Sequence, residues 1–532
     1  MIDQMDVISA FLNGTIDTTV YLVQPEGFSL GLRTSMFCIL YKSIYGLCQA
    51  ARIWYNVLHS ALVEIGFIRL FADLACWFKI TTVTVITFVI AYVDDTLSVG
   101  NKDEVKEIKD HLKRKFKTKD IREGKVFIEL NLSRDREKGL ILINQAHYAK
   151  ALLDTYGILD CNPVSCLITP GEVLVRGTDL ELLSPTEKKL YQAIVGSLSY
   201  LMNCSRLDLA HSVTKHAQFA TYPTKSHMAA AKHVLRYLKR TMNVMLTLGS
   251  SDAIKEVDSK NYHQLTAYFD SSWADDKDDS CSIFRYIVMY GTNPLVWKSK
   301  KHKSVSSSRI DAEYLAATET TYEICWILNL FRGLQLEIQS LVTLFGDNEN
   351  ANNLANRISS NNRTRHIDIR QRYVTEKVSE GVIKVVWIPT SEQITDIFTK
   401  TLPRPTLNKL CSKMRVYLLY TQTQTTHTCS ICLTSFKSNN TLHRHIRHMH
   451  LGKGKCQRCV YVHTNKILMI RLRTMITMRL RTIITMRLHT IITIHLRTMI
   501  MMCLRTIIKD YYNAFCAHIY DFIFYCVMVA LR

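Results

Sequence analysis

The sequence predicts a multidomain protein of mixed α+β and α/β class, followed by a small ββα unit and a low-complexity tail. The chain has 532 residues, too many for a single hydrophobic core. Over about residues 1–415, short β-branched runs that end in acids alternate with helical patterns. Beyond Thr421 the composition changes, with 16 Lys and Arg against two acids.

The net charge of +21 indicates a polyanionic partner. The charge is uneven, because residues 421–532 carry +14 and the preceding 420 residues carry +7. The first residues show no basic segment followed by an apolar run, so we expect an intracellular protein, nuclear or cytoplasmic, with reduced thiols. No apolar run reaches the roughly 18 residues that span a membrane, and no membrane partner is expected.

Two short apolar runs flank adjacent acids between Val89 and Val99. The pattern predicts a buried strand, a tight turn that carries Asp94 and Asp95, and a second strand. Neighbouring carboxylates between core strands need a positive partner, and Mg²⁺ or Mn²⁺ suits their oxygen atoms. A polar hairpin tip in water is the alternative. Upstream, Asp6 ends another short apolar stretch.

Residues 101–119 predict an amphipathic helix. Val105, Ile108 and Leu112 fall on one face, and Lys and Arg side chains surround that face. The charged side chains are either solvated or contact a nucleic-acid backbone.

The middle of the chain predicts further strands and helices. A strand is expected over 126–131, and one helix is expected from Tyr191 and another over 227–240. Their expected role is packing. The polar composition of residues 241–264 predicts a linker.

Four acids after residue 265 each stand at or near the end of a predicted element. Asp270 and Asp347 end strands, Glu313 lies in the first turns of a helix, and Asp396 follows a Trp-Ile-Pro segment. One acid per element predicts a four-carboxylate site for Mg²⁺ or Mn²⁺. Taken singly, each acid is more typical of an ordinary surface residue.

These motifs resemble the reverse transcriptase and RNase H parts of the Pol polyprotein of copia-type LTR retrotransposons. The likeness is carried by Asp6 with the Ala-Phe-Leu-Asn-Gly stretch, by Tyr-Gly-Leu-x-Gln-Ala with Arg52 and Trp54, and by Tyr-Val-Asp-Asp. The resemblance implies metal-binding acids in a polymerase palm and in RNase H, and palm residues that contact substrate. The implied catalytic acids are Asp6, Asp94 and Asp95 in the palm and Asp270, Glu313, Asp347 and Asp396 in RNase H, and the implied substrate contacts are Phe11, Gln49 and Arg52.

The resemblance also implies a domain order. It places a reverse transcriptase palm and thumb at 1–160, a connection and linker at 161–264, and an RNase H-like domain at 265–415. Because the chain begins almost at Asp6, we expect the family's basic fingers residues to be absent. This favours nuclease activity over DNA synthesis. Phe284-Arg285 replaces the family's Ser-Gly at an expected hairpin, where a positive φ would strain Arg285.

Residues 427–450 have the spacing of a two-Cys two-His zinc finger. Chance spacing in a His-rich segment is the alternative, and His448 could replace one ligand. If the finger binds duplex DNA, three side chains occupy base-facing helix positions. RNA or protein binding stays open. The expected zinc ligands are Cys429, Cys432, His445 and His450, and the base-facing residues are Ser438, Thr441 and Arg444.

The rest of the tail has no second complete finger and contains short repeats. Residues 456–463 begin a second finger that lacks its His pair. Eight-residue repeats occupy 471–508, and 509–532 stay unassigned. Period eight matches no coiled coil, so the repeats are either translated tandem DNA or a basic arm for membrane surfaces or nucleic acid.

Three hypotheses follow for the function. The first is a transposition enzyme that uses two-metal phosphoryl transfer on an RNA–DNA hybrid, with nuclease favoured over polymerase. The second is a zinc-finger protein that binds nucleic acid. The third is an inactive transposon remnant.

Overall fold

The computed structural model divides the chain into two compact units, one holding residues 1–418 and one holding 419–516. Among the residues described, no helix is long and apolar enough to cross a membrane. The structure describes residues 1–24, 37–82, 85–123, 126–169, 174–249, 264–274, 279–336, 341–356, 369–399, 402, 404–418, 427–428 and 435–436.

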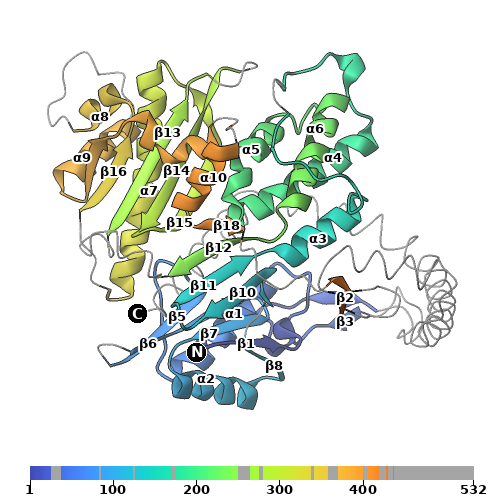
Figure 1. The fold of residues 1–532 in the computed structure, drawn as a ribbon. Helices are drawn as coiled ribbons and strands as arrows, with labels where there is room; N and C mark the ends of the chain where they lie inside the picture. Colours follow the sequence, from blue (N-terminus) through green and yellow to red (C-terminus); the bar gives the residue numbers. More distant parts are fainter. Residues whose placement is uncertain are drawn as a thin grey trace, which may run out of the picture. The chain divides into compact units, whose positions relative to one another are not determined.

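The first sheet has six strands in the order β4-β5-β6-β7-β1-β8 (Figure 1). Helices α1 (Ala50–Val63) and α2 (Lys102–Lys115) pack on it around a core that includes Met5, Trp54 and Trp77. The strands are β1 (Ile2–Val7), β4 (Ile68–Arg69), β5 (Cys76–Thr82), β6 (Val85–Tyr92), β7 (Asp95–Val99) and β8 (Thr118–Glu123). A short pair, β2 (Tyr21–Val23) with β3 (Phe37–Ile39), lies outside this sheet.

The helix expected over 101–119 is shorter. Asn101 caps α2, since its side chain accepts a hydrogen bond from the Asp103 backbone N–H. The helix ends at Lys115, and β8 follows and pairs with β1, which sets Lys119 opposite Asp6. The prediction fails at this end because pairing with a distant strand overrides the local helical pattern.

The second sheet, in the order β18-β12-β11-β10-β9, joins segments far apart in the sequence. The prediction of a linker over 241–264 is wrong for residues 244–249, because these residues form β12 and its Leu246 and Leu248 are fully buried. The run is short, and its pairing with β11 and β18 supplies the stability that the local pattern does not reveal. The strands are β9 (Val126–Phe127), β10 (Leu130–Asp135), β11 (Leu140–Asn144), β12 (Val244–Gly249) and β18 (Val416–Leu418).

The strand expected over 126–131 is two strands joined by a tight turn. Ile128 and Glu129 form this turn, with φ of 48° and 57°. Positive φ at both central residues matches the right-handed twist of the paired strands, although it disfavours residues other than Gly and Asn.

Helices account for most of the segment between β11 and β12. Helix α4 (Pro185–Cys204) begins earlier than predicted because Ser184 and Glu187 form a capping box. Helix α6 (Lys225–Arg240) matches the expected range to within two residues and is capped by Thr224. Helices α3 (Ala146–Thr155) and α5 (Ala210–Gln218) complete the group. The boundaries at 160 and 264 stay predictions.

The third sheet has five strands in the order β15-β14-β13-β16-β17 (Figure 1). The first three strands are antiparallel neighbours, whereas β13 pairs in parallel with β16, and β16 with β17. Helix α7 (Arg309–Gly333) packs on β13 and β14 and is buried on several sides. The strands are β13 (Leu265–Ser272), β14 (Cys281–Tyr290), β15 (Asn293–Val305), β16 (Val342–Gly346) and β17 (Ile383–Trp387). Helices α8 (Glu349–Ala355), α9 (Ile369–Ser379) and α10 (Arg404–Lys413) follow.

Candidate functional site

The three acids expected in the palm lie at one end of the first sheet. Asp6 of β1 is the register partner of Asp95 at the start of β7. The backbone N–H of Val7 donates to the carbonyl of Asp94 at 2.8 Å. The antiparallel pairing of β1 with β7 therefore brings the acid at the end of one strand beside the turn that carries the other two.

The turn with Asp94 and Asp95 is strained and held in place. Val93 has φ 55°, a left-handed conformation that β-branched residues rarely adopt. The indole N–H of Trp54 donates to the Val93 carbonyl at 2.5 Å. Trp54, which the sequence marked only as part of a motif, thus fixes the backbone that presents the two acids.

Two opposing effects act on the Asp95 carboxyl. Burial, together with the carboxylates of Asp6 and Asp94, raises the pKa of Asp95 above its ordinary value. The buried amide of Gln4 opposes this shift by donating to Asp95 Oδ1 at 3.0 Å. A cation bound here would favour the ionised form of Asp95.

The expected substrate-contact residues divide into two groups. Phe11 packs on Tyr45, with ring centroids 4.5 Å apart, and burial and the Asp94 carboxylate raise the pKa of Tyr45. Tyr45 is therefore close enough to Asp94 to feel its charge, although the sequence pattern showed it only as one residue of a motif. Arg52 instead pairs with the exposed Asp17 at 2.5 Å.

Gln49 also bonds within the protein, since its amide donates to Thr18 Oγ1 at 3.5 Å. Both Gln49 and Arg52 therefore contact the segment between Asn13 and Tyr21 in this structure. Their role at a substrate stays a prediction.

The second cluster gathers acids from three elements of the third sheet region. Ligand oxygens of Asp270, Glu313 and Asp347 all lie within 4.8 Å of one another. Asp270 lies in β13, Asp347 follows β16, and the two strands are parallel neighbours. Among the residues that the structure describes, no other three acidic, His or Cys side chains place one ligand atom each within 4.8 Å of one another, so Asp6, Asp94 and Asp95 do not form such a group.

Close approach of the strands makes this convergence possible. A Cβ atom on Gly346 would lie 2.4 Å from the Phe269 ring and 2.7 Å from Asn352 Oδ1. Glycine before Asp347 therefore lets the end of β16 sit against β13. On α7, the side chain of Ser308 accepts from the Asp311 N–H and starts the helix so that Glu313 falls in its second turn.

Several carboxylate oxygens of this cluster have no hydrogen-bond donor. Glu313 is 0% exposed, and neither carboxylate oxygen accepts a hydrogen bond of good geometry, although the Ser271 backbone N–H and the Arg309 guanidinium partly oppose the rise of its pKa. Asp347 Oδ1 is likewise buried without one, whereas its Oδ2 accepts from Thr390 Oγ1 at 2.9 Å. Burial above all, and then the carboxylates of Asp270 and Asp347, raise the pKa of Glu313 well above its ordinary value. Such oxygens fit a hard divalent cation.

Asp396 is not a member of this group. It lies in a short 3-10 helix, Ile394–Phe398, and its Oδ1 accepts from Thr399 Oγ1 at 3.3 Å. The group of three acids that converge within 4.8 Å does not include Asp396, and a part for Asp396 in a metal site stays a prediction.

The prediction that Arg285 sits in a strained hairpin is wrong. Arg285 lies within β14, opposite Asp270 in the register, and is not among the residues with positive φ. The side chain is 1% exposed, and its Nη1 lies 3.9 Å from Asp270 Oδ2.

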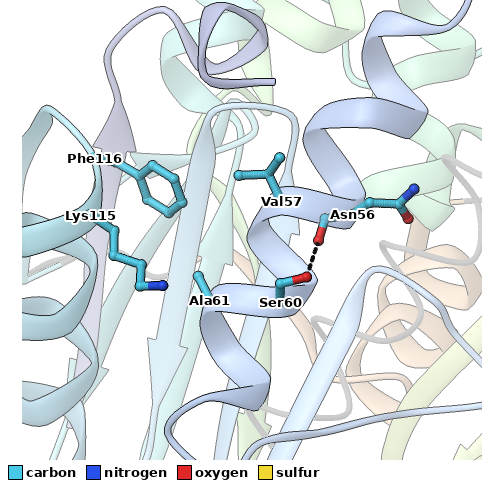
Figure 2. Close-up of a pocket in the computed structure, with 6 residues that line it drawn as sticks. All are labelled: Asn56, Val57, Ser60, Ala61, Lys115 and Phe116. Atoms are coloured by element: carbon cyan, nitrogen blue, oxygen red, sulfur yellow. Dashed lines mark hydrogen bonds between the residues drawn. The ribbon is translucent and has the colours of Figure 1, made fainter. Parts of the chain in front are cut away.

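A cavity of about 450 Å³ opens between α1 and the end of α2 (Figure 2). The Ser60 hydroxyl donates to the Asn56 carbonyl at 3.0 Å, and the Lys115 ammonium pairs with Glu64. The Ser60 hydroxyl and the Lys115 ammonium are thus engaged within the protein, and none of the acids above lines the cavity. The lining residues are Asn56, Val57, Ser60, Ala61, Lys115 and Phe116.

The expected zinc ligands lie outside the described residues, as do the three base-facing positions of the finger. Two short strands of this segment are described. β19 (His427–Thr428) pairs antiparallel with β20 (Ser435–Phe436), so that the pair brackets Cys429 and Cys432 in sequence.

Known proteins resemble most of this chain. A family model described as reverse transcriptase (RNA-dependent DNA polymerase) matches residues 1–170. The retrovirus-related Pol polyprotein from transposon TNT 1-94 of Nicotiana tabacum is 32% identical over 417 residues, which are 78% of this chain. This chain spans 30% of the length of that polyprotein.

A shorter relative is matched over its whole length. The putative transposon Ty5-1 protein of Saccharomyces cerevisiae is 31% identical over 325 residues, which are 60% of this chain and 100% of the relative. Among solved structures, RNase H1 from Halobacterium salinarum aligns with 24% of this chain and 89% of its own, at 12% identity and a TM-score of 0.18.

We expect Glu313→Gln to stabilise the metal-free protein at neutral pH by about 2 kcal/mol, because it removes an ionisable group that is buried without a donor. Since the folded-state pKa of Glu313 is raised, ionisation costs the wild type stability as pH rises above the unfolded-state pKa. The difference between the two proteins should therefore shrink as the pH falls towards about 4.

Denaturant unfolding between pH 5 and 8 with a chelator present measures this difference. Glu319→Gln is the matched control, because it makes the same change on α7 outside the cluster. Equal stabilities of Glu313→Gln and wild type at neutral pH would contradict the account of an unpaired buried carboxylate.

Proposed function

This chain belongs to the Pol family of retrotransposons and corresponds to its reverse transcriptase and RNase H region, and we propose that it cleaves the RNA strand of an RNA–DNA hybrid. The observation that carries this proposal is the cluster of Asp270, Glu313 and Asp347, whose oxygens converge within 4.8 Å. Buried acids without donors are costly unless a cation neutralises them. A metal-dependent site explains why the fold gathers them.

The chemistry is hydrolysis of a phosphodiester. Water attacks phosphorus, the bond from phosphorus to the 3′ oxygen breaks, and that oxygen takes up a proton. Asp270, Glu313 and Asp347 would hold Mg²⁺ or Mn²⁺, which would supply Lewis acidity toward the attacking water and the phosphate. Glu313 and Asp347 offer buried oxygens that accept no hydrogen bond of good geometry, and Asp270 offers the third carboxylate. We propose that Asp396 assists from its separate helix.

The palm acids support a second activity of the same class. Asp6 lies opposite Asp95 in the strand register, and Trp54 holds the turn before Asp95. These features favour phosphoryl transfer to a primer by two metal ions bound to Asp6, Asp94 and Asp95. We infer DNA synthesis on an RNA template for this site. Phe11 and Tyr45 would then contact the incoming nucleotide.

Zinc binding by the tail is a separate proposal. The spacing of Cys429, Cys432, His445 and His450 favours one zinc ion, and the antiparallel pair β19–β20 is what such a finger places around its cysteines. The finger would bind nucleic acid, with Ser438, Thr441 and Arg444 at its contact positions.

We expect the purified full chain to cut the RNA of a labelled hybrid when Mg²⁺ or Mn²⁺ is present. Asp270→Asn and Glu313→Gln should each slow cleavage by about 100-fold or more, because each removes a metal ligand. Glu319→Gln should cleave at the wild-type rate. A hybrid left uncut by the wild type, or cut equally well by Glu313→Gln, would remove this proposal.

Elemental analysis of the purified chain should find one zinc ion. We expect Cys429→Ser to lose it, because a finger with three ligands binds zinc weakly. Cys456→Ser, in the half finger, should retain it and serves as the matched control. Equal zinc contents of the two variants would count against the finger.

A further inference from the structure

A second cavity, of about 330 Å³, lies beside the third sheet, and none of the acids of the cluster described above lines it. Side chains of β13, β14, β16 and α10 contribute to its wall, together with the turn after β14 and the segment after β17. Its volume is at the lower end of the roughly 300–1,000 Å³ that is usual for small-molecule sites. The cavity therefore has room for one nucleotide-sized molecule and not for a duplex.

The floor of this cavity is aromatic and apolar. Tyr268 of β13 and Phe345 of β16 are register partners, and their ring centroids lie 4.9 Å apart. Met289, Ile388 and Ile394 are buried and extend the apolar wall. Two aromatic side chains beside one another offer a surface on which a planar ring can stack.

The polar side chains that line the cavity lack partners within the protein. Thr292 Oγ1 is buried without a hydrogen bond. Within the part of the chain that the structure describes, the Tyr268 hydroxyl and the Glu392 carboxylate form no hydrogen bond, and the Lys413 ammonium forms no ion pair. Burial above all, and then the Glu392 carboxylate, raise the pKa of Tyr268, so this carboxylate lies close to the aromatic floor. A bound molecule would supply the partners that these groups lack.

The two exposed charges at the cavity have opposite signs, and this selects the ligand. Lys413 disfavours a purely cationic ligand, and Glu392 disfavours a purely anionic one. Guanine presents two adjacent N–H donors on one edge, which match the two oxygens of a carboxylate, and a phosphate on the same molecule suits an ammonium group. Adenine and cytosine each place a ring-nitrogen acceptor beside their amino group, and this nitrogen would repel the carboxylate.

We propose that this cavity binds a guanine nucleotide, with its base on Tyr268 and Phe345, its N–H edge on Glu392 and its phosphate on Lys413. The site is separate from the acidic cluster and does not depend on the proposed nuclease activity. The ligand is a free mononucleotide or the 5′-phosphorylated guanosine at the end of a strand, because both present the same groups.

Equilibrium dialysis of the full chain with GMP tests this proposal, with a chelator present to keep metal from the acidic clusters. We expect one GMP per chain and binding of AMP that is weaker by about tenfold or more, because AMP lacks one of the two donors. Glu392→Gln should weaken GMP binding by about the same factor and abolish the preference over AMP. Glu380→Gln, at an exposed acid just after α9 that does not line the cavity, should bind GMP as the wild type does.

A second variant separates the phosphate contact from folding. Lys413→Met should weaken GMP binding and leave guanosine binding unchanged, whereas damage to the cavity would weaken both. Lys409→Met, on the same helix but outside the cavity, is the matched control and should change neither.

Short single strands that begin with a 5′-phosphorylated guanosine or adenosine distinguish the two sources of the ligand. A preference for the guanosine end that is lost in Glu392→Gln would identify a strand end, and GMP binding without that preference would identify a free nucleotide. Absence of GMP binding to the wild type at millimolar concentration, or equal binding of GMP and AMP, would overturn the proposal. GMP binding that is the same in Glu392→Gln as in the wild type would also overturn it.

Discussion

The parallel pairing of β13 with β16 is the constraint on which the acidic cluster of the third sheet depends. The register matches Tyr268 with Phe345, so that Asp270 in β13 and Asp347 just after β16, each two residues further on, lie at the same level. Helix α7 packs on β13 and brings Glu313 to within 4.8 Å of both. Three carboxyl groups therefore meet because of backbone pairing and helix packing.

Both acidic clusters hold carboxyl groups close together, and they differ in the protein groups that stabilise those carboxyl groups. In the first sheet the Asp95 carboxylate accepts from Gln4, and the turn before it is held by Trp54. In the third sheet a buried guanidinium lies beside Asp270, and the fully buried Glu313 carboxyl lies near the carboxylates of Asp270 and Asp347. The cluster in the third sheet therefore needs a bound cation more than the cluster in the first sheet does. Burying a charge away from water costs more free energy when the charge is not hydrogen-bonded.

Strand ends that carry acids could be predicted from the sequence because they are local patterns. Asp94, Asp270 and Asp347 each follow or end a β-branched run, and the family resemblance supplied their grouping. Strands that depend on pairing with segments distant in the sequence could not be predicted from local patterns. β12 was taken for a linker because its stability comes from β11 and β18, and Lys119 was assigned to a helix although it lies in β8.

Side-chain environment was the least predictable property. Arg285 was expected to strain a turn, and it instead fills the interior of a regular strand, because nothing in its own segment reveals that Asp270 lies opposite. Tyr45 and Gln4 near the palm acids were also not singled out, since each becomes relevant only once β1 and the Asp94 turn are paired. Burial and charge partners are products of the assembled sheet, and local sequence does not encode them.

The central claim is that Asp270, Glu313 and Asp347 form a cation site. Anomalous diffraction from crystals soaked in Mn²⁺ tests it most directly. The account predicts an anomalous peak within bonding distance of oxygens from all three side chains. Absence of a peak there, with Glu313 instead bonded to protein donors, would contradict it.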